Sequence, residues 1–165
     1  MPDTALVIID MQTALVSGAH DEKGVLERVN RFITRARAAG VPVIFVQHSH
    51  ATFAPMAKGE PGWQLDARLD QQASDLRIDK QACDAFDSTP LADELRALGV
   101  KTVILAGLQT EYCIDTSARA ALGHGFDVVL MADCHTTGDD LLPAHQVIGY
   151  HNHILAQVVH PRHRI

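Results

Sequence analysis

The chain has 165 residues, of which 47% are hydrophobic and 21% are charged. These fractions are typical of a globular protein and exclude a disordered chain, and this length can bury a substantial core in one domain, expected over residues 1–165. Fourteen Lys and Arg against twenty Asp and Glu give a net charge of −6, and no basic stretch indicates a nucleic-acid partner. No apolar run approaches the ~18 residues of a membrane span, and no export signal is recognisable, so we expect a cytoplasmic protein with no membrane partner.

Short apolar runs rich in β-branched residues predict buried strands. They cover residues 5–9, 41–46, 102–106 and 127–131, and residues 77–80 resemble the end of a further short strand. Apolar residues at helical spacing predict helices over residues 25–36, 89–98, 110–122 and 143–158, with Pro90 in the first turn of the second. Residues 48–75 have no clear period, and so long a loop indicates either a functional segment or a missed element; we favour function.

The alternation of strands and helices predicts an α/β fold, a three-layer α-β-α sandwich with a mostly parallel sheet. Ligands of such sheets lie beyond the carboxyl ends of the strands. The residues that follow the predicted strands are therefore the first candidates for a site: Asp10, Gln47, His48, residues 107–113 and residues 133–135.

Cys113 is the first candidate for chemistry. It falls in the first turns of a predicted helix, where free N–H groups and the helix dipole favour a thiolate and an oxyanion. The alternative is that Cys113 is a small buried hydrophobic residue at a strand–helix junction. No Cys-x-x-Cys pair is present, which argues against a zinc ribbon or a thioredoxin-type site, and in a reducing compartment all three cysteines should be free thiols. Cys83 and Cys134 are expected to be inert.

Asp10 and Lys80 complete a possible acid–base–nucleophile set with Cys113. Asp10 ends an apolar strand and is suited to act as a general base, although Asp is also common as a helix cap or turn residue. A lysine is usually a solvated surface charge, but beside a thiol Lys80 would help to hold the thiolate.

The sequence resembles the isochorismatase-like cysteine hydrolases, which include nicotinamidases and carbamoylsarcosine amidases. The resemblance spans nearly the whole chain. It rests on Ala-Leu-Val-Ile-Ile-Asp-Met-Gln at 5–12, Val-Pro-Val-Ile-Phe-Val-Gln-His at 41–48, Gly-Glu-Pro-Gly-Trp at 59–63, Asp-Lys at 79–80, Gly-Leu-Gln-Thr-Glu-Tyr-Cys at 107–113 and Ala-Asp-Cys-His-Thr-Thr at 132–137. The Gly-x-x-Thr-x-x-Cys segment, following the Asp and the Lys in this order, is the most specific of these.

The resemblance implies a catalytic triad of Asp10, Lys80 and Cys113, in which the thiol attacks a carbonyl carbon and water later hydrolyses the acyl-enzyme. It also implies a non-proline cis peptide, here between Leu108 and Gln109. The backbone N–H groups of Gln109 and Cys113 would then donate to the oxyanion.

The segment after the second strand departs from the nicotinamidase pattern. Those relatives carry an Asp-x-His metal element there, whereas this chain has His48 and His50 separated by one residue and no Asp. Two histidines on one face of an extended segment would hold a metal weakly and are more often part of a polar loop. We therefore expect no metal and no other cofactor. The isochorismate-cleaving members lack the nucleophilic Cys, so Cys113 argues against that reaction.

A second group of residues is expected to contact substrate. Gln12 would turn toward Asp10, unless it is a surface residue at a helix start; the aromatic side chains would wall a pocket, unless they pack in the core or between subunits. The group comprises Gln12, His48, Trp63, Phe86 and Tyr112, with Phe53 as a further possible wall.

We therefore predict a metal-independent cysteine hydrolase that cleaves the C–N bond of a small amide or carbamoyl compound, and a homo-oligomer, a dimer or tetramer as in the family. One alternative is a metal-assisted nicotinamidase. The other is a non-catalytic thiol or redox protein on the same fold.

Overall fold

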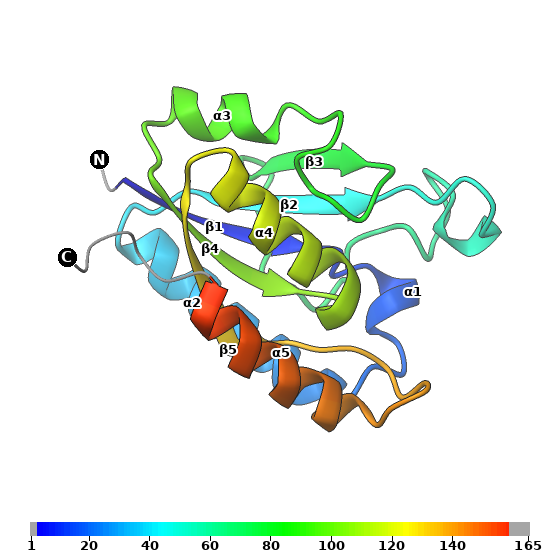
Figure 1. Ribbon diagram of the computed structural model, residues 1–165. Helices are drawn as coiled ribbons and strands as arrows, with labels where there is room; N and C mark the ends of the chain where they lie inside the picture. The colour runs from blue at the N-terminus through cyan, green and yellow to red at the C-terminus, as the bar shows by residue number, and fades with distance from the viewer. Residues whose placement is uncertain (1–2, 159–165) are drawn as a thin grey trace.

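The computed structural model describes residues 3–158 and has a five-stranded sheet at its centre (Figure 1). The strands are β1 (Thr4–Ile9), β2 (Val43–His48), β3 (Leu76–Lys80), β4 (Thr102–Gly107) and β5 (Asp127–His135). Their order is β3-β2-β1-β4-β5, and every pair is parallel. The predicted α/β class is confirmed, including the short strand that ends at Lys80.

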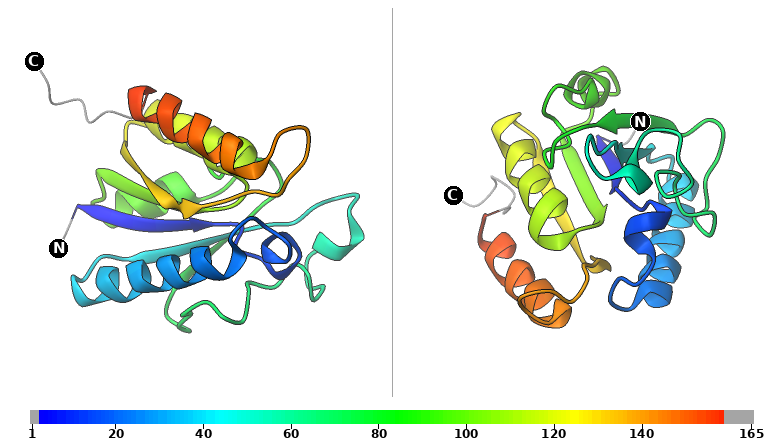
Figure 2. Two further views of the ribbon diagram at one scale, coloured as in Figure 1. Left: turned by 90° about the horizontal axis from the view of Figure 1, so that it is seen from below. Right: turned by 90° about the vertical axis from the view of Figure 1, so that its right-hand side faces the viewer.

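Helices cover both faces of the sheet, which gives three layers (Figure 2). The helices are α1 (Thr13–Val16), α2 (Glu22–Ala38), α3 (Leu91–Ala97), α4 (Asp115–Gly123) and α5 (Ala144–Val158), with short turns η1 (Ala54–Met56) and η2 (Thr110–Ile114). No described helix is long and apolar enough to cross a membrane.

The two halves of the core follow from the alternation of side chains along β1. Leu6 and Ile8 pack with the apolar stripe of α2, including Val29. Val7 and Ile9 point the other way, into the core that α3, α4 and α5 cover. All four β1 side chains are almost fully buried, as expected for a central strand of a parallel sheet.

Three predicted boundaries were displaced. β2 begins at Val43, because Pro42 has no N–H and contributes only its carbonyl, which accepts from Leu6. Helix α3 begins at Leu91, with Pro90 just outside it. The segment after Thr110 opens as a π-helical turn, η2, before the regular helix α4.

The largest difference concerns β5, which was expected to end near residue 131 and continues to His135. A register irregularity after Leu105 lets the strand stay beside β4, so that His135 pairs with Gly107. Residues 133–135 therefore belong to the strand itself. The loop after β2 has only the short turn η1 and one antiparallel bridge between Gln12 and Leu65.

Candidate active site

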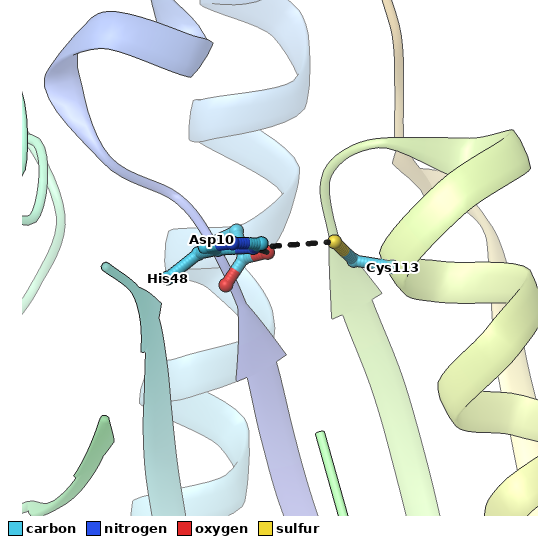
Figure 3. Close-up of side chains that lie close together, drawn as sticks. All are labelled: Asp10, His48 and Cys113. Atoms are coloured by element: carbon cyan, nitrogen blue, oxygen red, sulfur yellow. Dashed lines mark hydrogen bonds and ion pairs between the residues drawn. The ribbon is translucent and has the colours of Figure 1, made fainter. Parts of the chain in front are cut away.

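Four chemically capable side chains meet at the carboxyl edge of the sheet. Asp10 directly follows β1, His48 and Lys80 are the last residues of β2 and β3, and Cys113 lies in η2 after β4. Because parallel strands end at the same edge of the sheet, residues as far apart in the sequence as Asp10 and Cys113 come together there. Figure 3 shows the side chains of Asp10 and His48 next to each other, with the Cys113 side chain pointing toward them from η2.

The Lys80 ammonium lies at the centre of the group. Its Nζ is 2.8 Å from Asp10 Oδ2, 3.2 Å from Cys113 Sγ and 3.0 Å from His48 Nδ1, and it also donates to the Ala82 carbonyl at 2.9 Å. The side chains of Lys80 and Asp10 are both fully buried. A buried charge is tolerated only when it is paired and hydrogen-bonded, and this ammonium has more acceptors than its three hydrogens can serve.

Strand register explains the contact between His48 and Lys80. The two residues are directly paired across β2 and β3, so their side chains point to the same face of the sheet. The Ser49 N–H extends the ladder by donating to the Lys80 carbonyl at 2.8 Å. The Lys80 side chain is thus directed at the site by the sheet itself.

A tight backbone turn directs Asp10 inward. Its φ is +53°, in the left-handed region that residues other than glycine rarely adopt, and its carbonyl accepts from Gln12 N–H at 2.7 Å. Strained backbone of this kind recurs at functional sites. Burial raises the pKa of the Asp10 carboxyl, while Lys80 acts to lower it.

The state of Cys113 differs from the expectation of a thiolate favoured by a helix start. Burial, followed by the negative charge of Asp10, raises the pKa of the Cys113 thiol, although Lys80 works in the opposite direction. Burial acts to lower the pKa of Lys80, but the negative charges of Asp10 and Cys113 raise it overall. The raised pKa keeps Cys113 as a thiol at neutral pH, so it needs a base to become nucleophilic, and the Asp10 carboxyl lies beside it.

A close approach of β4 to β1 fixes the start of the Cys113 segment. Gly107 has φ +127°, and a Cβ there would overlap the Ile9 carbonyl, so only glycine fits. The next residue, Leu108, donates its N–H to that same Ile9 carbonyl. The peptide bond between Leu108 and Gln109 is cis, as the resemblance implied. The Gln109 N–H makes no hydrogen bond with the described residues.

A small pocket of about 200 Å³ opens onto Cys113. Gln109, His48 and Tyr112 line it together with Asp10. Its remaining walls are Leu15, His50, Phe53, Met56 and Cys83. Three of these, His50, Phe53 and Met56, come from the loop after β2.

Three residues that the sequence analysis expects to contact substrate are not on the wall of this pocket. The Gln12 amide is used to brace the backbone, accepting from His48 N–H and donating to the carbonyls of His48 and Trp63. Trp63 does not line the pocket; its indole N–H donates to Ser49 Oγ at 2.9 Å. Phe86 is a core residue, 5% exposed and stacked on Phe126. Residue type alone did not separate these positions from the pocket walls.

Other wall residues were missed because nothing local marks them. Leu15 and Met56 are ordinary apolar residues in the sequence; α1 carries Leu15, and η1 in the loop after β2 carries Met56, to the pocket. His50 was noticed beside His48, and the two rings are indeed stacked, with centroids 5.7 Å apart. Cys83, expected to be inert, is exposed and lies on the pocket wall.

A buried histidine supports the Cys113 segment from behind. His135 Nδ1 lies 2.9 Å from Thr110 Oγ1, and its Nε2 lies 2.9 Å from Asn152 Oδ1 on α5. Because the Asn152 oxygen can only accept, Nε2 carries the proton and Nδ1 accepts from Thr110. His135 therefore ties η2 to α5 without touching the pocket.

Comparison with known proteins identifies the family. The profile of the isochorismatase domain matches residues 4–159, and the chain belongs to the isochorismatase family. A streptothricin hydrolase of Streptomyces noursei is 36% identical over 84% of this chain and 56% of its own length. Nicotinamidase 3 of Arabidopsis thaliana is 34% identical over 84% of this chain and 75% of its own length. The chain thus spans about half the length of the streptothricin hydrolases that it matches, 56% of one and 50% of another.

Solved structures agree with this assignment. An isochorismatase family protein has a TM-score of 0.90 and 34% identity, with 96% of each chain covered. A pyrazinamidase of Pyrococcus horikoshii, solved in complex with zinc, has a TM-score of 0.81 and 25% identity, covering 96% of this chain and 97% of its own.

The donors of this site do not fit a resident metal. Asp10, His48 and Cys113 each offer a ligand atom, and these atoms lie within 4.8 Å of one another. However, the Lys80 ammonium already lies within 3.2 Å of all three, so a divalent cation there would face a positive charge at contact distance. His50 offers no second centre: its Nδ1 accepts from two backbone N–H groups, and among the described residues no third ligand joins it and His48.

Proposed function

We propose that this protein is a cysteine hydrolase that cleaves the C–N bond of a small amide or carbamoyl compound through a thioester intermediate. The observation that carries the proposal is the buried Lys80 ammonium within 3.2 Å of both Asp10 and Cys113, two residues that line a small pocket. A merely structural ion pair would not need a thiol as its third member. The names of the relatives, hydrolases and amidases, support the same class of reaction.

In the first half of the proposed reaction, Cys113 Sγ attacks the carbonyl carbon while Asp10 accepts the thiol proton. The Lys80 ammonium stabilises the negative charge that develops on sulfur as the proton leaves, which helps to ionise a thiol whose resting pKa is raised. The backbone N–H groups of Gln109 and Cys113 donate to the oxyanion of the tetrahedral intermediate.

The second half returns the enzyme to its starting state. The C–N bond breaks, the nitrogen leaves with the proton held by Asp10, and an acyl thioester on Cys113 remains. Water then attacks the thioester carbon, Asp10 accepts a proton from that water, and the C–S bond breaks. Sulfur recovers its proton from Asp10 as the acid product is released.

The test is a screen of small primary amides and carbamoyl compounds for release of ammonia, repeated with Cys113→Ala. The proposal expects turnover by the parent protein and a loss of about 10³-fold or more in the variant. Cys134→Ala is the matched control, because Cys134 is buried in the α2 side of the core, away from the pocket. Equal activity in Cys113→Ala would refute the mechanism.

The second candidate is a metal-assisted nicotinamidase, favoured by the nicotinamidase and zinc-bound pyrazinamidase relatives. Turnover of nicotinamide that disappears on chelation and returns with zinc would favour it over the metal-independent mechanism. Reversible oxidation of Cys113 without hydrolysis of any amide would instead favour a thiol protein that has no catalytic function.

We also propose a homo-oligomer, a dimer or a tetramer. Next to η2, the exposed apolar side chains of Leu141, Leu142 and Tyr150 surround a depression of about 270 Å³ that Tyr112 joins to the active-site pocket. Exposed apolar patches of this kind are typical of protein–protein contacts. A monomeric mass by light scattering would refute this part of the proposal.

A further inference from the structure

The charges around the active-site pocket restrict what it can hold. Its walls are apolar or aromatic at Leu15, Phe53, Met56 and Tyr112. Among the described residues, Asp10 is the only carboxylate on the wall, and no lysine or arginine lines it. At about 200 Å³, the pocket is also smaller than the sites of drug-sized ligands.

The nearest cation is not free to meet a substrate. Lys80 is fully buried, and its ammonium is already surrounded by Asp10, Ala82, His48 and Cys113 at 2.8–3.2 Å. Pairing it with a substrate carboxylate would require breaking the contact with Asp10, the proposed base. The positive charge of Lys80 is therefore balanced before any substrate arrives.

The His48 ring at the end of the pocket carries no charge to replace it. His48 Nδ1 faces the Lys80 ammonium at 3.0 Å, and a proton on this nitrogen would set two cations against each other. Nδ1 is thus the acceptor, and the ring's proton is on Nε2. An uncharged imidazole hydrogen-bonds an amide well but does not balance a carboxylate.

We propose that this pocket selects small uncharged amides and rejects amides that carry a carboxylate, such as N-carbamoyl amino acids. The inference rests on the proposed function, because it narrows the substrate class of the same site. Its physical basis is that a carboxylate moved from water into this pocket would find no cation, and would lie close to the Asp10 carboxylate.

Alkylation tests this selectivity without requiring turnover. Iodoacetamide is a small uncharged amide and iodoacetate is its carboxylate counterpart; each forms a bond from Sγ to its CH₂ carbon and releases iodide. The rate of each reagent at Cys113 is measured at about pH 8.5, where more of a thiol is ionised, and divided by its rate with N-acetylcysteine. Site-resolved mass spectrometry separates Cys113 from Cys83.

The expected result is that Cys113 favours iodoacetamide by about tenfold or more after this division. A ratio near one, or a preference for iodoacetate, would overturn the proposal. So would failure of iodoacetamide to label Cys113, since the pocket would then exclude a small uncharged amide.

A matched pair of variants at Phe53 adds a cation to the pocket. Phe53 lies on the wall and is 50% exposed, so polar substitutions there should be tolerated. Phe53→Arg should reduce the preference to within about threefold, whereas Phe53→Gln, which adds no charge, should retain it. Equal ratios in the two variants would show that charge does not control entry.

Hydrolysis of butyramide and succinamate, which have similar size, separates this proposal from the proposed function. Turnover of butyramide alone supports both. Turnover of succinamate at an equal or greater kcat/KM would overturn charge selection but keep the hydrolase. If neither compound is hydrolysed while Cys113 still favours iodoacetamide, charge selection stands and the proposed function loses support.

Discussion

Removal of Lys80 should expose the energetic role of the buried ion pair. At 2.8 Å, the attraction between Lys80 and Asp10 is about 6 kcal/mol for an effective dielectric constant of about 20. Desolvation of both groups offsets part of it, and breaking a buried pair by removing one partner typically costs about 3–5 kcal/mol. We expect Lys80→Met to lower the free energy of unfolding by that amount, and the Tm by about 6–20 °C.

A double-variant cycle identifies the cause of this loss. The penalty of Lys80→Met comes from a carboxylate left buried without its cation, so Asp10→Asn/Lys80→Met should recover at least about 2 kcal/mol. Lys101→Met is the control, because Lys101 pairs with Asp3 at 3.7 Å on the exposed surface and should lose less than about 1 kcal/mol. The parent, both single variants Asp10→Asn and Lys80→Met, the double variant and the Lys101→Met control are compared by urea denaturation at neutral pH.

The pH dependence gives a second check on the same reasoning. In Lys80→Met, burial without a counter-ion raises the pKa of Asp10 further above its unfolded value. A carboxyl with a raised folded pKa stabilises the fold when protonated, so this variant should regain stability as the pH falls from neutral toward the ordinary Asp pKa of about 4. A loss as small as that of Lys101→Met, or a double variant that loses the sum of both single losses, would refute the account.

Two further predictions concern the backbone and the histidine of the site. Gly107→Ala should lower the free energy of unfolding by about 3 kcal/mol or more, because its Cβ would overlap the Ile9 carbonyl. Gly123→Ala is the control in the same urea titration: it lies in open space on α4 and should be neutral or slightly stabilising. Similar stabilities of the two variants would contradict the close approach of β4 to β1. Burial, then the charge of Lys80, lowers the pKa of His48 to about 4, so the unfolded chain binds a proton between about pH 4 and 6.5 that the folded chain does not. Stability should therefore fall as the pH drops through this range, and His48→Asn should reduce that dependence; an unchanged slope would assign it to other groups.

Local patterns determined most of the fold. The runs of β-branched residues at 5–9 and 102–106 form strands, the first fully buried and the second mostly buried, because a central parallel strand is apolar on both faces. The apolar residues at helical spacing that include Val29 predicted α2, because one face of that helix is buried against the sheet. The positions of Asp10 and Cys113 at strand and helix ends were also readable, since the carboxyl edge of such a sheet is where ligands bind.

The tertiary structure decided how these groups affect one another. The strand order places β2 and β4 on either side of β1, so His48 and Cys113 come together beside Asp10, and these three side chains share the Lys80 ammonium. That crowding raises the pKa of the Cys113 thiol, against the expectation from a helix start alone, because burial and a neighbouring carboxylate act through space.

The tertiary structure also decided which residues line the pocket, because residue type alone does not separate them from core residues. Phe53 and Phe86 are alike in residue type, yet the loop after β2 carries Phe53 to the pocket while Phe86 packs in the core against Phe126. Gln12 points to backbone groups of a segment about fifty residues away. Periodicity records whether a residue is buried, but the neighbours it is buried against depend on long-range contacts that no local pattern contains.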